Sequence, residues 1–265
     1  MRESLGLPLD FGFEGEGVSF SEAKLALFFA AKGDDKTLGR APGPAAVADA
    51  SRYVEFFEMR GGLHALDVGI YAELCGSSAP ETLASDRFTR ALAKGVFPLV
   101  IAENRFAMPM ECGPTVALWG KIGRAECEET VLGPDRDALL VGVRAASERA
   151  YKTARDRVTM VTSEQLQSTF SRLDKITRGL ESPVHLSIDF DVFAPNVVDL
   201  ERVVEPGGLA WYDFVHVLEK LFDRPGVKSA ELVGAEGVRA KTRAALIGAQ
   251  ILTKIAALLQ RGQPS

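Results

Sequence analysis

Short apolar segments alternate along this chain with segments of helical periodicity, and this alternation constrains the fold more than any other feature. Strands are predicted at residues 4–9, 63–71, 96–103, 138–143, 158–162, 185–196 and 227–234. Helices are predicted between them, at residues 45–60, 79–95, 146–156, 163–179, 210–223 and 239–260. Strands joined by helical crossovers form parallel sheets that helices cover on both faces. We therefore expect one α/β domain over residues 1–265, with three α/β/α layers and a mostly parallel sheet.

The segment HLSIDFDVFAPN, residues 185–196, places two acidic residues at the end of an apolar strand. Alternate side chains of an extended strand share a face. One face of this segment would then be apolar and the other polar, the latter with His185, Ser187, Asp189 and Asp191. Sheets of this class keep their functional sites at the carboxyl ends of the strands. Asp189 and Asp191 are therefore the first candidates for a site.

The spacing of this acidic pair is compatible with several roles. Two structural readings are an exposed strand edge and a helix cap or ion pair. The functional reading is a site for hard divalent cations, which take oxygen ligands and can share a carboxylate between two ions. The D-x-D spacing alone does not decide among these readings.

The surrounding motifs resemble those of the ureohydrolases, the arginase and agmatinase family of manganese hydrolases. HLSIDFDVFAPN is similar to the family signature S-x-D-x-D-x-x-D-P, whose first two aspartates bridge the metals. EPGGLAWYDFVHVLEKL, from Glu205, is similar to the family's P-x-x-G-G-L loop and helix, and VKSAELVGAEG to its strand ending in V-E-x-N-P. GRAPGPAAVADASRYV resembles a family helix start, and ALAKGVFPLVIAENRFAMP the segment that carries G-G-D-H-S. The resemblance implies an arginase-like α/β/α fold.

The chain departs from the family at most of the metal ligands. Residues 102–106 read AENRF where the family has G-G-D-H-S, so Arg105 stands where a metal-binding histidine is expected. The family's D-A-H-x-D segment has no counterpart here, because the chain runs from TVALWGKIG directly into RAECEETVLGPDRD. Ala194 stands where the family signature has its third aspartate. The resemblance carries over only Asp189 and Asp191 as metal ligands, and Glu231 as the glutamate that receives the substrate guanidinium.

We expect Arg105 to neutralise the two aspartates in place of the metals. A planar guanidinium can bind carboxylates by paired hydrogen bonds and offset the cost of burying them. The alternative is that Arg105 is a surface arginine in a degenerate loop. The three histidines, His64, His185 and His216, are expected in structural positions rather than as ligands.

Composition excludes several other classes of function. The 31 Lys and Arg against 36 Asp and Glu give a net charge of −5 without a basic block, so we expect no nucleic-acid partner. Cys75, Cys112 and Cys127 lie far apart, which argues against a disulfide framework or a zinc site. The chain shows neither a signal pattern nor an apolar run long enough to span a bilayer, so we expect no membrane association and a cytoplasmic location.

Two functional readings follow from the resemblance and its departures. The first is a pseudoenzyme that has lost the manganese site, binds no cofactor, and acts as a scaffold or by binding a partner or a small guanidino ligand. The second is an active metal-dependent hydrolase of a guanidino or amidine compound with a rearranged site, which would need manganese. A third reading is an unrelated α/β protein. By resemblance, we expect a homo-oligomer or assembly with a paralogous subunit.

Overall fold

The computed structural model describes residues 7–8, 18–32, 43–54, 57–58, 64–65, 68–77, 79–105, 113–123, 138–168, 177, 180, 183–200, 205–224 and 226–262. Cys112, Cys127 and the segment 124–137 lie outside these residues. The chain forms two compact units, one of residues 1–103 with 235–265 and one of residues 104–234. The single domain that the sequence predicts stays a prediction.

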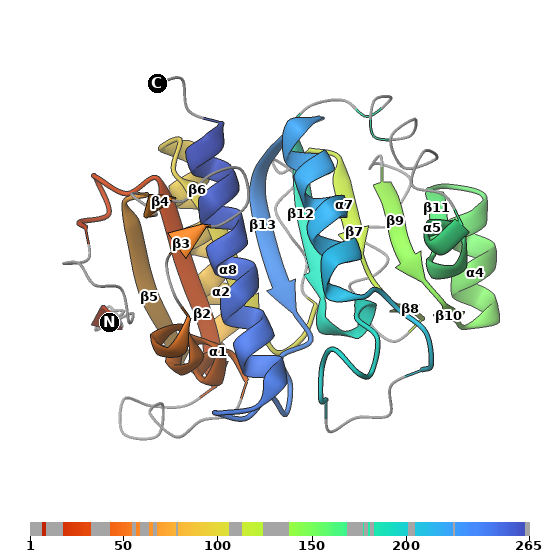
Figure 1. Ribbon diagram of the computed structural model, residues 1–265. Helices are drawn as coiled ribbons and strands as arrows, with labels where there is room; N and C mark the ends of the chain where they lie inside the picture. Colours follow the sequence, from red (N-terminus) through yellow and green to blue (C-terminus); the bar gives the residue numbers. More distant parts are fainter. Residues whose placement is uncertain are drawn as a thin grey trace. The chain divides into compact units, whose positions relative to one another are not determined.

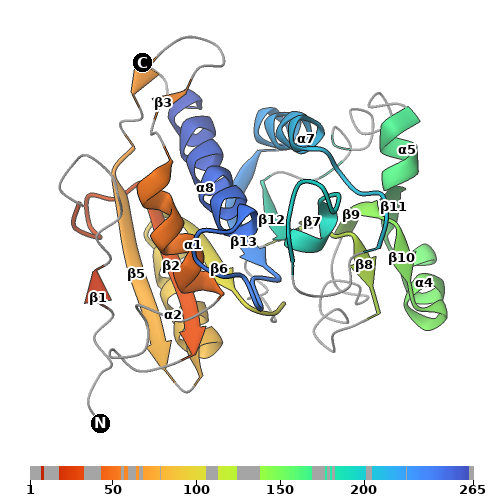
Figure 2. The ribbon, with the colours of Figure 1, turned by 60° about the horizontal axis from the view of Figure 1, so that its bottom comes forward.

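The strands of the first unit follow the order β1 (Leu7–Pro8), β5 (Ile70–Ser77), β2 (Leu25–Lys32) and β6 (Phe97–Ala102). Neighbouring strands are parallel except for β1, which pairs antiparallel with β5. Figures 1 and 2 show α2 (Pro80–Ala93) on one face of these strands, and α1 (Pro44–Ala50) and α8 (Arg243–Arg261) on the other. The unit therefore has the layered arrangement that the alternation predicts.

Three details of the first unit differ from the sequence prediction. The helix predicted at residues 45–60 ends at Ala50 and continues only as a 3-10 turn, η2 (Ser51–Tyr53), because Val54 is already extended. The strand predicted at residues 63–71 is divided between β4 (His64–Ala65), which pairs with β3 (Phe57–Glu58), and β5. Strand β2 was not predicted, although its uninterrupted apolar run is of the kind that is compatible with a fully buried strand.

The strands of the second unit are parallel and follow the order β13 (Val227–Val233), β12 (Val184–Asp189), β7 (Thr115–Leu118), β9 (Ala138–Val143) and β11 (Thr159–Thr162). Helix α7 (Trp211–Asp223) covers one face at β12 and β7 (Figure 1), while α4 (Glu148–Arg155) and α5 (Ser163–Ser168) pack against β11. Strands β7, β9 and β12 are buried along their whole length. The strands predicted at residues 138–143, 158–162 and 227–234 are confirmed.

The extended conformation predicted through Asp191 is wrong, because β12 ends at Asp189. Residues Phe190–Val192 form a 3-10 turn, η4. The side chain of Asp189 caps this turn by accepting a hydrogen bond from the backbone N–H of Asp191 at 2.8 Å. Such local bonds let an aspartate end a regular element. The exposed-edge reading is also wrong, since β12 lies between β13 and β7 and both aspartates are buried.

Tight loops follow several of these strands at their carboxyl ends. Beyond β7, the short strand β8 (Lys121–Ile122) pairs in parallel with β10 (Ala145–Ala146), which follows β9. Beyond β12, Phe193 packs against Trp211 and Phe214 of α7, with ring centroids 6.4 and 4.8 Å away. These contacts hold the loops that carry charged side chains at one edge of the sheet.

Among the described residues, no helix has both the length and the hydropathy of a bilayer-spanning segment.

Candidate functional site

Arg105 lies against both aspartates of the D-x-D segment. Its Nε donates to Oδ2 of Asp189 at 3.0 Å, and its Nη2 lies 3.0 Å from the same oxygen and 3.4 Å from Oδ2 of Asp191. The three side chains are 6%, 6% and 9% exposed, so this ion cluster is almost sealed from water. In such surroundings a carboxylate pair requires a nearby cation, and here the protein supplies one.

Further contacts fix the orientation of the Arg105 guanidinium. Nη2 donates to the backbone carbonyl of Lys121 at 2.9 Å. The guanidinium carbon lies 4.0 Å from the ring centroid of Trp119, which is a close cation–π contact. Arg105 is therefore held by an aromatic ring, a carbonyl oxygen and two carboxylates, and the surface-arginine reading does not describe its position.

Every carboxylate oxygen of Asp189 and Asp191 has a hydrogen-bond or ion-pair partner. Oδ2 of each faces Arg105. Oδ1 of Asp189 accepts from the N–H of Asp191, and Oδ1 of Asp191 accepts from the N–H of Gly120, both at 2.8 Å. A Cβ atom at position 120 would overlap the carbonyl oxygen of Asp191 and Nη1 of Arg144. Glycine at this position therefore permits the close approach of β7's end to the acidic pair.

Two further cations border the acidic pair, and neither was predicted from the sequence. Lys121 Nζ lies 3.1 Å from Oε1 of Glu205. Arg144 donates to three backbone carbonyls, those of Asp191 at 2.6 Å, Glu205 at 3.2 Å and Phe193 at 3.4 Å. Both residues follow a buried apolar strand closely, and Arg144 comes directly after β9. A charged residue at the carboxyl end of such a strand is the sequence feature from which they could have been predicted.

The charges of this cluster balance. Asp189, Asp191 and Glu205 contribute three negative charges, and Arg105, Lys121 and Arg144 three positive ones. Burial lowers the pKa of Arg144 from its usual value, and the charges of Asp191, Glu205 and Asp189 oppose that shift. We name these six residues the charge cluster.

The charge cluster does not fit a pair of manganese ions. Divalent cations of this class need several oxygen or imidazole ligands each. The two aspartates have already committed their four oxygens, and the guanidinium of Arg105 would repel a dication placed between them. Ala194 offers no side-chain ligand, and its N–H donates to the carbonyl of Leu209. No group of three or more His, Cys, Asp or Glu side chains with ligand geometry occurs within the described parts of the chain.

A row of buried polar side chains crosses β12 and β13 and reaches Trp119, which directly follows β7. Ser187 on β12 pairs in register with Glu231 on β13, and its Oγ donates to Oε1 of Glu231 at 2.5 Å. Nε1 of Trp119 donates to the same hydroxyl at 2.9 Å. His185 Nδ1 lies 2.9 Å from Oγ of Ser229, and its Nε2 lies 4.0 Å from Oε1 of Glu231. This row joins the interior of the sheet to Trp119, on which Arg105 stacks.

The structure places Glu231 in this row and Arg105 in the charge cluster. Glu231 is 2% exposed, and its partners among the described residues are Ser187 and His185. Its Oε2 has no hydrogen-bond partner within the described part of the chain. The predicted role of Glu231 in receiving a guanidinium would require a ligand to reach this buried face, and it stays a prediction. His185 is 1% exposed and occupies the structural position that the sequence predicts.

Comparisons with known proteins agree with these motifs. A model of the arginase family matches residues 102–257. The N(1)-aminopropylagmatine ureohydrolase of Thermus thermophilus is 30% identical over 99 residues, which are 37% of this chain and 32% of that protein. The enzyme of the same name from Thermococcus kodakarensis is 26% identical over 114 residues, or 43% of this chain and 39% of that protein. The matches thus span only about a third of the length of these curated relatives.

Solved structures extend the similarity to nearly the whole chain. The agmatine ureohydrolase of Thermoplasma volcanium matches with a TM-score of 0.73 at 15% identity, over 92% of each chain. The formiminoglutamase of Trypanosoma cruzi, solved with Mn²⁺, matches with a TM-score of 0.75 at 12% identity, over 93% of this chain and 96% of that one. At such identities the likeness shows the fold, the three-layer α/β/α arrangement with a mostly parallel sheet. The family model, which matches residues 102–257 and so more than half of the chain, shows that the chain belongs to the arginase family.

Proposed function

We propose that this arginase-family protein is a pseudoenzyme, in which an internal salt bridge has replaced the dinuclear metal site. The observation that carries the proposal is the position of Arg105, whose guanidinium contacts Oδ2 of both Asp189 and Asp191. A water molecule becomes a nucleophile at neutral pH when a bound metal lowers its pKa to near neutrality. At this place the two carboxylates that could ligate such a metal are already paired with the Arg105 guanidinium.

The neighbours of Arg105 support the same reading. Lys121 and Arg144 add two cations, and the charge cluster is neutral without a metal. A pair of manganese ions would raise its formal charge to about +4, beside the side chains of Arg105, Asp189 and Asp191, which are nearly sealed from water. Removing Arg105 alone would not restore the family's full set of metal ligands, because the side chain of Ala194 has no ligand atom.

The alternative function is that of an active ureohydrolase with a rearranged site. The observation that favours it is the similarity to N(1)-aminopropylagmatine ureohydrolases. For this chain, such an activity would require Arg105 to leave the aspartates and other groups to complete the coordination. We rank it second because the structure pairs every oxygen of Asp189 and Asp191.

A urea-release assay separates the two functions. The protein is expressed and purified with manganese supplementation and assayed with agmatine, N(1)-aminopropylagmatine and arginine. The Thermus thermophilus ureohydrolase, assayed in the same buffers, is the positive control. We expect no urea above the level of heat-inactivated protein. Urea release that increases with manganese concentration, and that is lost in Asp189→Asn, would establish the alternative.

We propose further that the protein acts through association, as a homo-oligomer or with a paralogous subunit. The support is the family resemblance together with a scaffold that keeps its sheet and helices. Light scattering on the size-separated protein measures the mass of the particle. A mass equal to that of the 28.6 kDa chain, unchanged on addition of a co-expressed paralogue, would contradict this proposal.

A further inference from the structure

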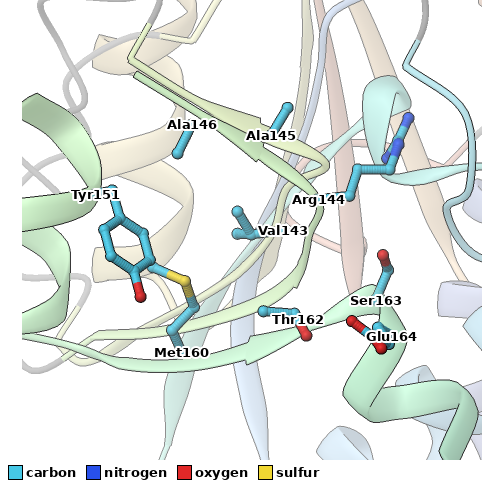
Figure 3. Close-up of a pocket in the computed structure, with 9 residues that line it drawn as sticks. All are labelled: Val143, Arg144, Ala145, Ala146, Tyr151, Met160, Thr162, Ser163 and Glu164. Carbon is cyan, nitrogen blue, oxygen red and sulfur yellow. The ribbon is translucent and has the colours of Figure 1, made fainter. Parts of the chain in front are cut away.

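A pocket of about 310 Å³ lies in the second unit, at the carboxyl ends of β9 and β11 (Figure 3). Its volume is at the lower end of the range of about 300–1,000 Å³ that is usual for small-molecule sites. Val143, Ala145 and Met160 give it apolar walls. Of the charge cluster, Arg144 lines this pocket, whereas Arg105, Asp189 and Asp191 do not.

An aromatic ring and a carboxylate lie on opposite sides of this pocket. Figure 3 shows Tyr151 reaching in from α4 on one side, and Ser163 and Glu164 at the start of α5 on the other. Tyr151 is 47% exposed, so a ligand could cover its ring without displacing the core. Aromatic faces attract organic cations, and a few placed polar groups fix the orientation of a ligand. Here the carboxylate belongs to Glu164, an exposed residue at the rim of the pocket.

The carboxylate of Glu164 has no ion-pair partner among the described residues. Two basic side chains of the adjacent helix α4 are paired elsewhere, Lys152 with Glu148 at 2.7 Å and Arg155 with Asp156 at 3.1 Å. The hydroxyl of Ser163, a residue only 8% exposed, likewise has no partner within the described part of the chain. A negative charge and a hydroxyl are therefore available to a ligand in the pocket.

Arg144 also lines the pocket, but its charge is directed elsewhere. Its Nε, Nη1 and Nη2 donate to the carbonyls of Glu205, Asp191 and Phe193. Figure 3 shows its guanidinium pointing away from Tyr151. An anionic ligand could pair with the Arg144 guanidinium only if these hydrogen bonds were broken. A cationic ligand could contact the Glu164 carboxylate without such a rearrangement.

We propose that this pocket binds a small organic cation, an ammonium group on an apolar stem. The ammonium group lies at the Glu164 carboxylate and the Ser163 hydroxyl, and the stem lies against Tyr151, Met160 and Val143. This inference goes beyond the proposed function and does not depend on it, since the pocket lacks Arg105, Asp189 and Asp191.

Calorimetric titration of the full-length protein with phenethylammonium tests the proposal. Phenethyl alcohol and hydrocinnamate serve as the neutral and anionic probes of similar shape. We expect phenethylammonium to bind about tenfold more tightly than the alcohol, as a charge-assisted hydrogen bond would provide. Amide NMR shifts should map to residues 143–146 and 159–164.

Two variants and a matched control complete the test. Glu164→Gln should weaken phenethylammonium about fivefold or more and leave the alcohol unchanged, and Tyr151→Leu should weaken it about threefold. Glu148→Gln removes the same charge from the exposed face of α4 and should have no effect. Absence of binding at millimolar phenethylammonium, tighter binding of hydrocinnamate, or equal effects of Glu164→Gln and Glu148→Gln would overturn the proposal.

Discussion

The Nε of Arg105 donates to Oδ2 of Asp189 at 3.0 Å, joining residues that are 84 positions apart in the sequence. Both side chains are 6% exposed. Ion pairs this deep add little stability compared with apolar replacements, but removing one partner alone is costly, because the other charge stays buried. The pair is therefore best tested by unmatched and matched substitutions.

Arg105→Met should lower the free energy of unfolding by about 3–5 kcal/mol, because it leaves two buried carboxylates without their cation. Equilibrium unfolding in urea measures the change. Arg155→Met, which breaks an exposed pair with Asp156, should change it by less than about 1 kcal/mol. Adding Asp189→Asn and Asp191→Asn to Arg105→Met should recover most of the loss. A triple variant no more stable than Arg105→Met would show that the cost does not arise from uncompensated charge.

Arg105→Gly should be stabilised by free ethylguanidinium, because this ion would replace the missing planar guanidinium between the two aspartates. At the same millimolar concentration, ethylammonium should stabilise it less, because an ammonium group lacks that geometry. Thermal unfolding with each additive measures the difference. Equal shifts for the two additives, or equal shifts in the unsubstituted protein, would show that no guanidinium site had been opened.

Gly120→Ala should destabilise the protein by about 1–3 kcal/mol or more, because its Cβ would overlap backbone that has little room to move. Gly262→Ala is the matched control, since a Cβ there meets nothing nearer than 3.7 Å and the residue has a φ of −75°. Chemical unfolding of the two variants should therefore differ clearly. A Gly120→Ala variant as stable as Gly262→Ala would contradict the close approach of Gly120 to Asp191.

Stability should fall between about pH 9 and 12, because the buried Cys75 and the partly buried Tyr71 of β5 ionise at lower pH in the unfolded chain than in the folded one. Burial raises the pKa of Cys75 from 9.0 to about 12, and burial with a hydrogen bond to Glu73 raises that of Tyr71 from 10.0 to about 12. A folded-state pKa above the unfolded value leaves stability intact below the unfolded pKa and removes it as pH rises. Unfolding midpoints across this range measure the slope. Cys75→Ala should make it shallower, and an unchanged slope would contradict the contribution of Cys75.

The sequence predicted much of this fold because helical and apolar periodicities are local properties. The strands at β6, β9 and β13 and the helices α2, α4 and α7 lie where their patterns place them. Strand β2 was not predicted, although LALFFAAK is buried on both faces like β9, which was predicted from a similar apolar run. The turn at Phe190–Val192 escaped prediction because a side-chain hydrogen bond from Asp191 N–H to Asp189 overrides the strand propensity of its neighbours.

The site was predictable only in part. Arg105 and the two aspartates were singled out from motif positions, and the structure brings all three together. Lys121 and Arg144 were missed because their roles depend on which strands are neighbours, β7 beside β12 and β9 beside β7. The burial of Glu231 beneath the cluster likewise follows from its register with Ser187, which no pattern along one strand reveals.

Manganese binding by the unsubstituted protein is the sharpest test of whether Arg105 has replaced the metals. The purified protein is dialysed against manganese at neutral pH, and the bound metal is counted by atomic spectroscopy beside an active ureohydrolase. The account predicts no manganese above the level that Asp189→Asn with Asp191→Asn retains, because the Arg105 guanidinium already satisfies the aspartates. Near-stoichiometric manganese that disappears in this double variant would contradict it.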